Sequence, residues 1–107
     1  MTLRQEKVSE LIRRIAAEYF NAEAGPQSLA TVTSCEVSPD MKKGTIFVTV
    51  LPEDKEEDFI HFARRRRKDL REYLKRKTKM KILPFLDVKI DLGEKNRQRI
   101  DELSEQN

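Results

Sequence analysis

The stretch LATVTSCEVSPDMKKGTIFVTVL, residues 29–51, decides the fold more than any other part of this 107-residue chain. Its two ends, residues 29–37 and 45–51, are rich in β-branched side chains, which predicts two strands. The turn between them contains Pro39, which presets φ, and Asp40, whose carboxylate can hydrogen-bond the turn backbone. We therefore expect the two strands to pair as a β-hairpin.

Ahead of the hairpin, residues 3–22 carry apolar side chains at the spacing of an amphipathic helix. Thr2 and Gln5 match a capping box at its start, and Gly25 with Pro26 should end it. One side of this helix is expected to pack on the core, while a polar face of mixed charge meets water.

Beyond the hairpin, a second helix is expected from about residue 54 to 78. It begins in an acidic run that suits the positive end of a helix dipole: Glu53, Asp54, Glu56, Glu57 and Asp58. Residues 85–91 then alternate apolar and polar side chains, which predicts a third, half-buried strand. The sequence thus predicts an α+β domain in residues 1–93, with helices on one face of a three-stranded sheet. Residues 94–107 are expected to form a C-terminal extension, flexible or a short helix.

The composition excludes several kinds of function. A single Cys rules out an internal disulfide and fits a reducing cytoplasm, and one Cys with one His provides no metal-ligand cluster. No apolar run approaches the ~18–20 residues of a membrane span, and no signal-peptide pattern opens the sequence. We therefore expect a cytoplasmic protein with no metal, no cofactor and no membrane contact. A monomer is expected, because no apolar stripe is left once the core is assigned.

Candidate catalytic side chains are few. Cys35 lies in a predicted strand without a His or an acid at motif spacing, so it is expected to be a packed thiol. His61, on a helix flank, is expected to be a surface histidine. Asp87, Asp91 and Asp101 would suit a metal-dependent nuclease, but no third carboxylate or base is placed with the first two. We therefore expect no enzymatic activity and no small-molecule substrate.

Positive charge is concentrated in residues 64–81, here called the basic segment. It holds 11 Lys or Arg against two acids, for a net charge of +9, whereas the other 89 residues hold 11 bases and 17 acids, for −6. A positive element on an acidic body predicts a polyanionic partner, and nucleic acid is the first candidate. The predicted RNA-binding residues are Arg64, Arg65, Arg66, Arg67, Lys68, Arg71, Lys75, Arg76, Lys77, Lys79 and Lys81.

Helical spacing places four of these cations in one stripe opposite the apolar face: Arg64, Lys68, Arg71 and Lys75. Arg66 instead falls on the apolar face, where an unpaired guanidinium would be too costly. Either its stem carries the charge out to solvent, or the helix bends near residues 65–68. We favour the bend.

Aromatic side chains are expected to contribute little to this surface. Tyr73 is predicted to lie in the core, so base stacking is not expected and recognition should depend on RNA shape and backbone. Lys42 and Lys43, on the hairpin turn, are candidates for a second RNA contact. An ordinary role as turn lysines is an equal alternative for both.

Three blocks of the sequence resemble the ribosome-binding factor A family, the bacterial small-subunit assembly factors. Residues 37–48, VSPDMKKGTIFV, are similar to the family's V-S-P-D-L-(R/K)-x-A-x-V-y-V hairpin. Residues 70–74 and 80–86, LREYL and MKILPFL, match i-R-x-x-L and l-R-x-x-P-x-L at the same spacing. Asp91 and residues 99–101, RID, fall where the family has F-x-x-D and r-I-d.

This resemblance covers residues 4–103 and implies a type II KH-like fold of order α-β-β-α-(kink)-α-β. It also implies binding to 16S rRNA in the free or immature 30S subunit, with a role in late subunit maturation and rRNA processing that is typically important in the cold. In the family the helix kinks at an Ala-x-Gly motif, which corresponds here to Arg66, Arg67 and Lys68. The kink is therefore expected at the same place, although the chain departs from the motif.

Two other hypotheses remain open. The chain could be a generic KH-like module with another RNA target, which would bind isolated RNA and ribosomal particles comparably. It could also be a protein-interaction domain that docks an acidic partner, in a contact insensitive to nuclease.

Overall fold

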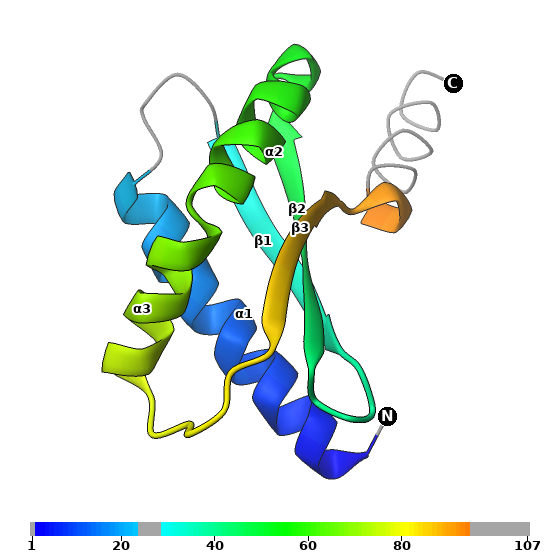
Figure 1. Cartoon of the computed structure of the whole chain (residues 1–107). Helices are drawn as coiled ribbons and strands as arrows, with labels where there is room; N and C mark the ends of the chain where they lie inside the picture. Colours follow the sequence, from blue (N-terminus) through cyan, green and yellow to red (C-terminus); the bar gives the residue numbers. More distant parts are fainter. Residues whose placement is uncertain (1, 24–28, 95–107) are drawn as a thin grey trace.

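The computed structural model describes residues 2–23 and 29–94 of the chain. In this part, three α-helices lie on one face of a three-stranded sheet (Figure 1). The elements are, in order, α1 (Leu3–Glu23), β1 (Leu29–Val37), β2 (Lys43–Leu51), the 3₁₀ helix η1 (Glu53–Lys55), α2 (Glu56–Arg65), α3 (Arg67–Lys77) and β3 (Phe85–Ile90). The predicted α+β class and order of elements are confirmed. None of the described helices is long and apolar enough to cross a membrane.

The predicted bounds agree closely with the structure. β1 is as predicted, β2 begins two residues earlier than predicted, β3 ends one residue earlier and α1 ends one residue later. The predicted helix end at Gly25 and Pro26 lies outside the described residues. The same is true of the predicted C-terminal extension from residue 95 onward, so both stay predictions.

The central strand of the sheet is β2, which pairs antiparallel with β1 and parallel with β3. The hairpin turn is closed by the N–H of Ser38, which donates to the Lys43 carbonyl at 2.8 Å. Asp40 Oδ1 accepts from the Lys42 N–H at 3.1 Å, as the sequence predicted for a turn aspartate. A parallel neighbour requires a crossover connection, and α2 and α3 supply it.

A bulge in β1 lets both ends of this strand face the helices. The register with β2 shifts between Val32 and Ser34, so that Val32 and Cys35 are both buried although three positions separate them. The extra residue at the bulge is Thr33, whose hydroxyl donates to Asp91 Oδ2 at 2.6 Å. Without the bulge, strict alternation along β1 would place Val32 and Cys35 on opposite faces of the sheet; with it, both side chains face the core.

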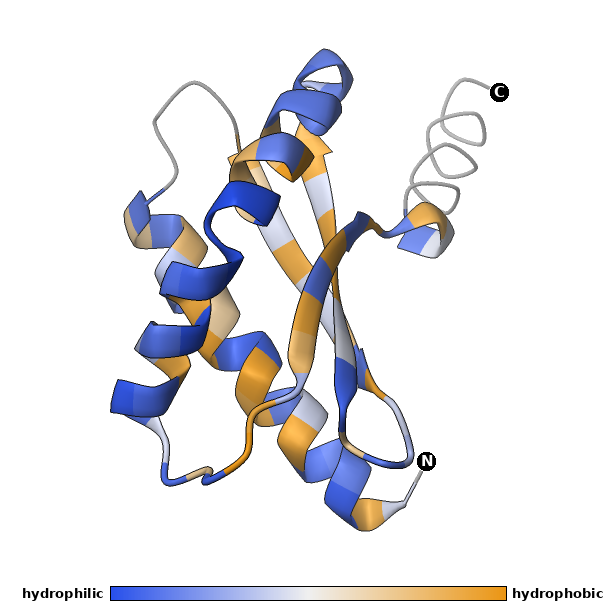
Figure 2. Cartoon of the chain, in the orientation of Figure 1, coloured by the Kyte–Doolittle hydropathy of each residue, from blue (hydrophilic) through white to orange (hydrophobic). Residues whose placement is uncertain are grey.

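The core lies between the sheet and the three helices, where the apolar segments of the chain meet (Figure 2). Aromatic rings of α1 and α2 contact each other within it, and the centroids of Phe20 and Phe59 are 5.4 Å apart. The largest fully buried side chains come from α1, α3 and two strands: Ile12, Phe20, Ile46, Val48, Leu70, Leu74 and Val88.

The capping box at the start of α1 is confirmed. The N–H of Gln5 donates to Thr2 Oγ1 at 3.1 Å, and the N–H of Thr2 donates to Gln5 Oε1 at 2.9 Å. Gln5 Nε2 also donates to the carbonyl of Val37 at 3.0 Å. This buried side chain therefore caps α1 and also attaches its first turn to the end of β1.

The helical region predicted over residues 54–78 is present, and the structure divides it into η1, α2 and α3. The break that the sequence favoured is confirmed at Arg66, whose φ of −98° and ψ of 5° separate α2 from α3. Arg66 is not buried there, since 43% of its side chain is exposed and Nη1 lies 3.3 Å from Glu23 Oε2. The break thus gives the guanidinium a route to solvent and an acidic partner.

Six large apolar side chains remain exposed in the described part of the chain. They belong to separate segments of the described chain: Leu3, Leu29, Leu51, Ile82, Phe85 and Leu92. Leu29 and Leu51 are direct partners in the β1–β2 register, so these two lie side by side. Exposed apolar side chains are common on monomers. The expected monomer therefore stays a prediction.

Leu70 should be essential for stability, because its side chain is completely buried on the core-facing side of α3. We expect Leu70→Ala to lower the free energy of unfolding by about 2–5 kcal/mol, measured by urea denaturation. Leu3→Ala, at a helical leucine that is 66% exposed, is the matched control and should change it by less than about 0.5 kcal/mol. Equal effects of the two substitutions would contradict the placement of α3 on the core.

The Cys35 thiol should react slowly with alkylating reagents. Burial raises the pKa of this thiol to about 12, so the thiolate that reacts is scarce at pH 8 in the native state. We expect alkylation by iodoacetamide, followed by mass spectrometry, to be far slower in native protein than in urea. Rapid alkylation of the native protein would show that β1 does not hold Cys35 in the core.

Candidate nucleic-acid interface

The basic segment covers the last turn of α2, all of α3 and the connection to β3. None of its eleven cations is buried: Arg66 and Arg67 are partly exposed, and the other nine are exposed. The helices carry them because their apolar faces occupy the opposite side, with Phe59 and Ala63 buried on α2 and Leu70 and Leu74 on α3. The fold therefore presents the whole segment to solvent.

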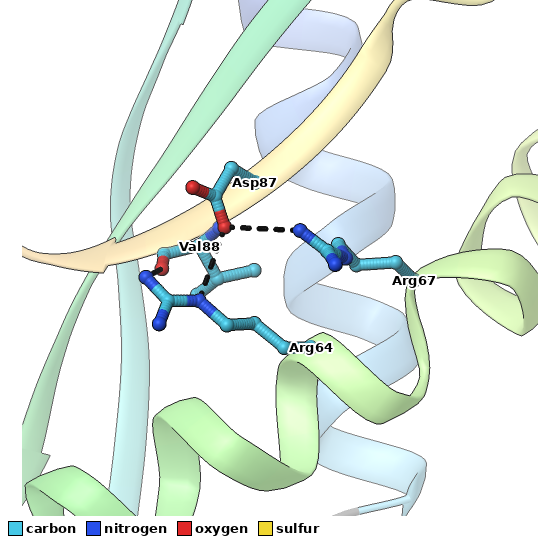
Figure 3. A network of polar contacts seen from close by, with 4 residues as sticks. All are labelled: Arg64, Arg67, Asp87 and Val88. Atoms are coloured by element: carbon cyan, nitrogen blue, oxygen red, sulfur yellow. Dashed lines mark hydrogen bonds and ion pairs between the residues drawn. The ribbon is translucent and has the colours of Figure 1, made fainter.

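One carboxylate on β3 organises two of the arginines (Figure 3). Asp87 Oδ1 accepts from Arg64 Nε at 3.2 Å and from Arg67 Nη1 at 3.4 Å. The same oxygen accepts from the N–H of Val88 at 2.8 Å, and Arg64 Nη2 lies 3.5 Å from the Val88 carbonyl. Two guanidinium groups are thus held beside the edge of β3, and together with Asp87 they leave one net positive charge.

The predicted stripe of four cations is divided by the break at Arg66. Arg64 turns to β3, whereas Lys68, Arg71 and Lys75 remain exposed on the outer side of α3. Lys75 Nζ lies 3.5 Å from Glu72 Oε1, one turn back along the helix. Within the described residues, Lys68 and Arg71 have no ion-pair partner. These two side chains are therefore available for an external anion.

The opposite flank of α3 is occupied by contacts with α1. The Tyr19 hydroxyl donates to Asp69 Oδ2 at 2.6 Å, and Arg66 pairs with Glu23. Burial, together with the bond to Asp69, raises the pKa of Tyr19 to about 12, so this hydroxyl stays a donor. Asp69, one of the two acids of the basic segment, is thus used to hold α3 on α1.

Tyr73 differs from the prediction, because its ring is half-buried rather than in the core. One part of the ring approaches Tyr19, with centroids 5.5 Å apart. The guanidinium of Arg76 and the ammonium of Lys77 lie 5.8 Å and 5.5 Å from the Tyr73 centroid. Cation–π contacts therefore hold two cations near the C-terminal end of α3.

The hairpin lysines lie beside the start of β3. Lys42 and Lys43 are both exposed, and the Lys42 carbonyl accepts from the N–H of Phe85 at 2.8 Å. Lys43 is the direct partner of Phe85 in the β2–β3 register. The structure therefore places this candidate second contact beside the first residue of β3.

Phe85 was missed by the sequence analysis. Its ring is 59% exposed, and the guanidinium of Arg67 lies over it, 5.3 Å from the ring centroid. The signal was present in the alternation of β3, which places Leu86 and Val88 in the core and so directs Phe85 to the opposite face. This part of the surface is therefore both cationic and aromatic.

The residues considered for catalysis are dispersed. Cys35 is buried, and His61 is exposed with Nε2 3.7 Å from Glu57 Oε1. Asp87 is paired with arginines and Asp91 with Thr33, while Asp101 lies outside the described residues. No group of three or more His, Cys, Asp or Glu that could hold a metal ion occurs among residues 2–23 and 29–94. The described site is thus a charged surface suited to binding.

Comparisons with known proteins show the family of the chain. The model of the family described as ribosome-binding factor A matches residues 4–104. Ribosome-binding factor A of Methylobacterium nodulans is 32% identical over 107 residues, which cover 95% of this chain and 79% of that protein.

Two structures from Thermus thermophilus share the fold. The crystal structure of ribosome-binding factor A from this organism has a TM-score of 0.72 and 25% identity, over 80% of this chain and 94% of that one. A homology model of the Thermus protein fitted into the cryo-EM map of a 30S complex has a TM-score of 0.67 and 27% identity, over 76% and 88%. The KH-like fold implied by the sequence resemblance is thus confirmed. Because the family model spans nearly the whole chain and the fold agrees, the chain belongs to the ribosome-binding factor A family.

Proposed function

We propose that this chain binds 16S rRNA in the free or immature 30S ribosomal subunit and assists its late maturation, including rRNA processing. The observation that carries the proposal is the surface of the basic segment, where eleven cations from consecutive elements all reach solvent. The Thermus relative that was fitted into a 30S complex has the same fold, which supports the small subunit as the partner. We further propose that the protein acts in the cytoplasm, as a binding factor and not as an enzyme.

Electrostatics supports RNA as the ligand. Each Lys or Arg that neutralises a phosphate releases condensed counterions, so a dense set of cations gains affinity for a polyanion. Like charges three or four residues apart on a helix cost a few tenths of a kcal/mol in the free protein. Lys68, Arg71 and Lys75 have this spacing on the outer side of α3. A helix selected only for stability would place acids among them.

The cations are expected to divide the work of binding. Lys68 and Arg71 are unpaired in the described structure and can follow an irregular phosphate backbone. Arg64 and Arg67 are oriented by Asp87, and each uses only part of its five N–H donors in the contacts observed. The remaining donors can contact a phosphate while the guanidinium stays on Asp87. The edge of β3 would thus provide a preorganised contact beside a flexible one on α3.

The two alternative functions predict different binding behaviour. A generic RNA-binding module would bind free RNA and every ribosomal particle alike, and a contact with an acidic protein would survive nuclease. The family and the 30S complex of the Thermus relative favour the small subunit over both alternatives, whereas the cationic surface alone would suit any polyanion.

Neutralising the outer side of α3 should weaken subunit binding and reduce its salt dependence. We expect the triple variant Lys68→Gln, Arg71→Gln, Lys75→Gln to lose affinity for free 30S subunits, measured by co-sedimentation over a salt series. Since each lost phosphate contact lowers the slope of log affinity against log salt by about 0.7–0.9, the slope should fall by roughly 2–3. Whole ribosomes and large subunits provide the test of selectivity.

The matched control removes the same charge outside the basic segment, by Lys7→Gln, Arg14→Gln and Lys55→Gln. If the control and the α3 variant lose the same affinity, total charge and not this surface would explain binding. Equal binding of the wild type to all particles would reduce the proposal to general RNA affinity. Failure of the wild type to bind subunits at low salt would contradict it.

A further inference from the structure

Phe85 is an aromatic ring that the fold holds in water. Burying a Phe side chain stabilises a protein, yet Phe85 is 59% exposed. Its neighbours in the chain, Pro84 and Leu86, are buried, so the strand itself places the ring outside the core. The N–H of Phe85 also donates to the Lys42 carbonyl at 2.8 Å, which fixes the backbone. The ring is therefore presented on a rigid element.

One cation lies over this ring, and a second belongs to its partner residue on the neighbouring strand. The guanidinium of Arg67 lies 5.3 Å from the ring centroid and is itself held by Asp87 at 3.4 Å. Lys43 is the register partner of Phe85 on β2. A ligand that fits this combination has a flat aromatic group for the ring and negative charge for the cations. An unpaired nucleotide has both, whereas an aliphatic peptide would leave the cations without a partner.

A second arginine–phenylalanine pair, Arg66 with Phe62, provides a comparison in which the contact serves the fold. Arg66 lies over the ring of Phe62 at 5.2 Å, close to the geometry of Arg67 over Phe85. Phe62, however, packs against the core with its centroid 6.1 Å from Phe59, and Arg66 is paired with Glu23 of α1. Phe62 therefore contributes to core packing, whereas Phe85 lies outside the core.

We propose that Phe85 and Arg67 form a stacking platform for one unpaired nucleobase of the bound RNA, with Lys43 beside it for a flanking phosphate. This inference rests on the proposed function and adds to it, because it requires single-stranded RNA at this point of the contact. It also revises the expectation from sequence that base stacking plays no part, which considered only Tyr73.

The test compares Phe85→Leu, which keeps an apolar side chain, with Phe85→Tyr, which keeps an aromatic ring. Binding to free 30S subunits is measured over the same salt series. We expect Phe85→Leu to weaken binding by about 5- to 150-fold, as for the loss of one stacked base, and Phe85→Tyr to retain it. The salt slope should be unchanged in both variants, because no charge is removed. Phe62→Leu is the matched control and should leave affinity unchanged.

A second measurement reports stacking directly. Short single-stranded RNA that contains 2-aminopurine should lose fluorescence on binding to the wild type and to Phe85→Tyr. The loss should disappear with Phe85→Leu, while binding to duplex RNA of equal length stays the same. Circular dichroism melting of each variant verifies that it is folded.

The outcomes separate the two proposals. If the wild type binds 30S subunits and Phe85→Leu binds equally well, the platform is overturned while the proposed function stands. The platform is also overturned if wild-type protein binds the single-stranded RNA and leaves its 2-aminopurine fluorescence unchanged. If the wild type binds neither subunits nor RNA, both proposals are overturned.

Discussion

The constraint on which this structure depends is the position of a cation, Arg66, in the middle of an apolar helical pattern. A continuous helix would direct this guanidinium into the core, where it would need a partner or lose several kcal/mol of hydration. The chain instead ends α2 and begins α3 at that residue. Both helices then pack their own apolar faces on the sheet, Phe59 and Ala63 from α2, Leu70 and Leu74 from α3. The break thus protects the core and also separates Arg64 from the cations of α3.

Asp87 bonds both to the backbone of the edge strand β3 and to two arginines of the basic segment. β3 is an edge strand, so its outer backbone groups could pair with another chain. At Val88 these groups are already bonded, because the N–H donates to Asp87 Oδ1 and the carbonyl accepts from Arg64 Nη2. The same contacts orient Arg64 and Arg67. A neutral residue at this position would leave the edge open and the two guanidinium groups free to repel each other. One acid therefore serves the fold and prepares the surface for an anion.

Local features of the sequence were sufficient to predict where the main helices and strands lie. β-Branched composition and turn chemistry predicted β1 and β2, and alternation predicted β3. The Thr2–Gln5 capping box predicted the start of α1, and the misplaced Arg66 predicted the break. Contacts between distant segments were beyond such reasoning. The parallel register of β2 with β3 brings Lys43 to Phe85, and packing of α2 beside β3 brings Arg64 to Asp87. Helical projection assumed one straight helix, so it joined Arg64 to a stripe that the break divides.

The distribution of charge has a further consequence for how the protein meets a polyanion. At physiological salt, charges are screened beyond about 8 Å, and α3 with its eleven residues is about 16 Å long. The net charge of +3 is therefore not what an approaching RNA experiences. It meets either the basic segment, at +9, or the remainder of the chain, at −6. This asymmetry would favour approach of a polyanion to α3 and the edge of β3 before contact. An even distribution of the same charges would give no such preference.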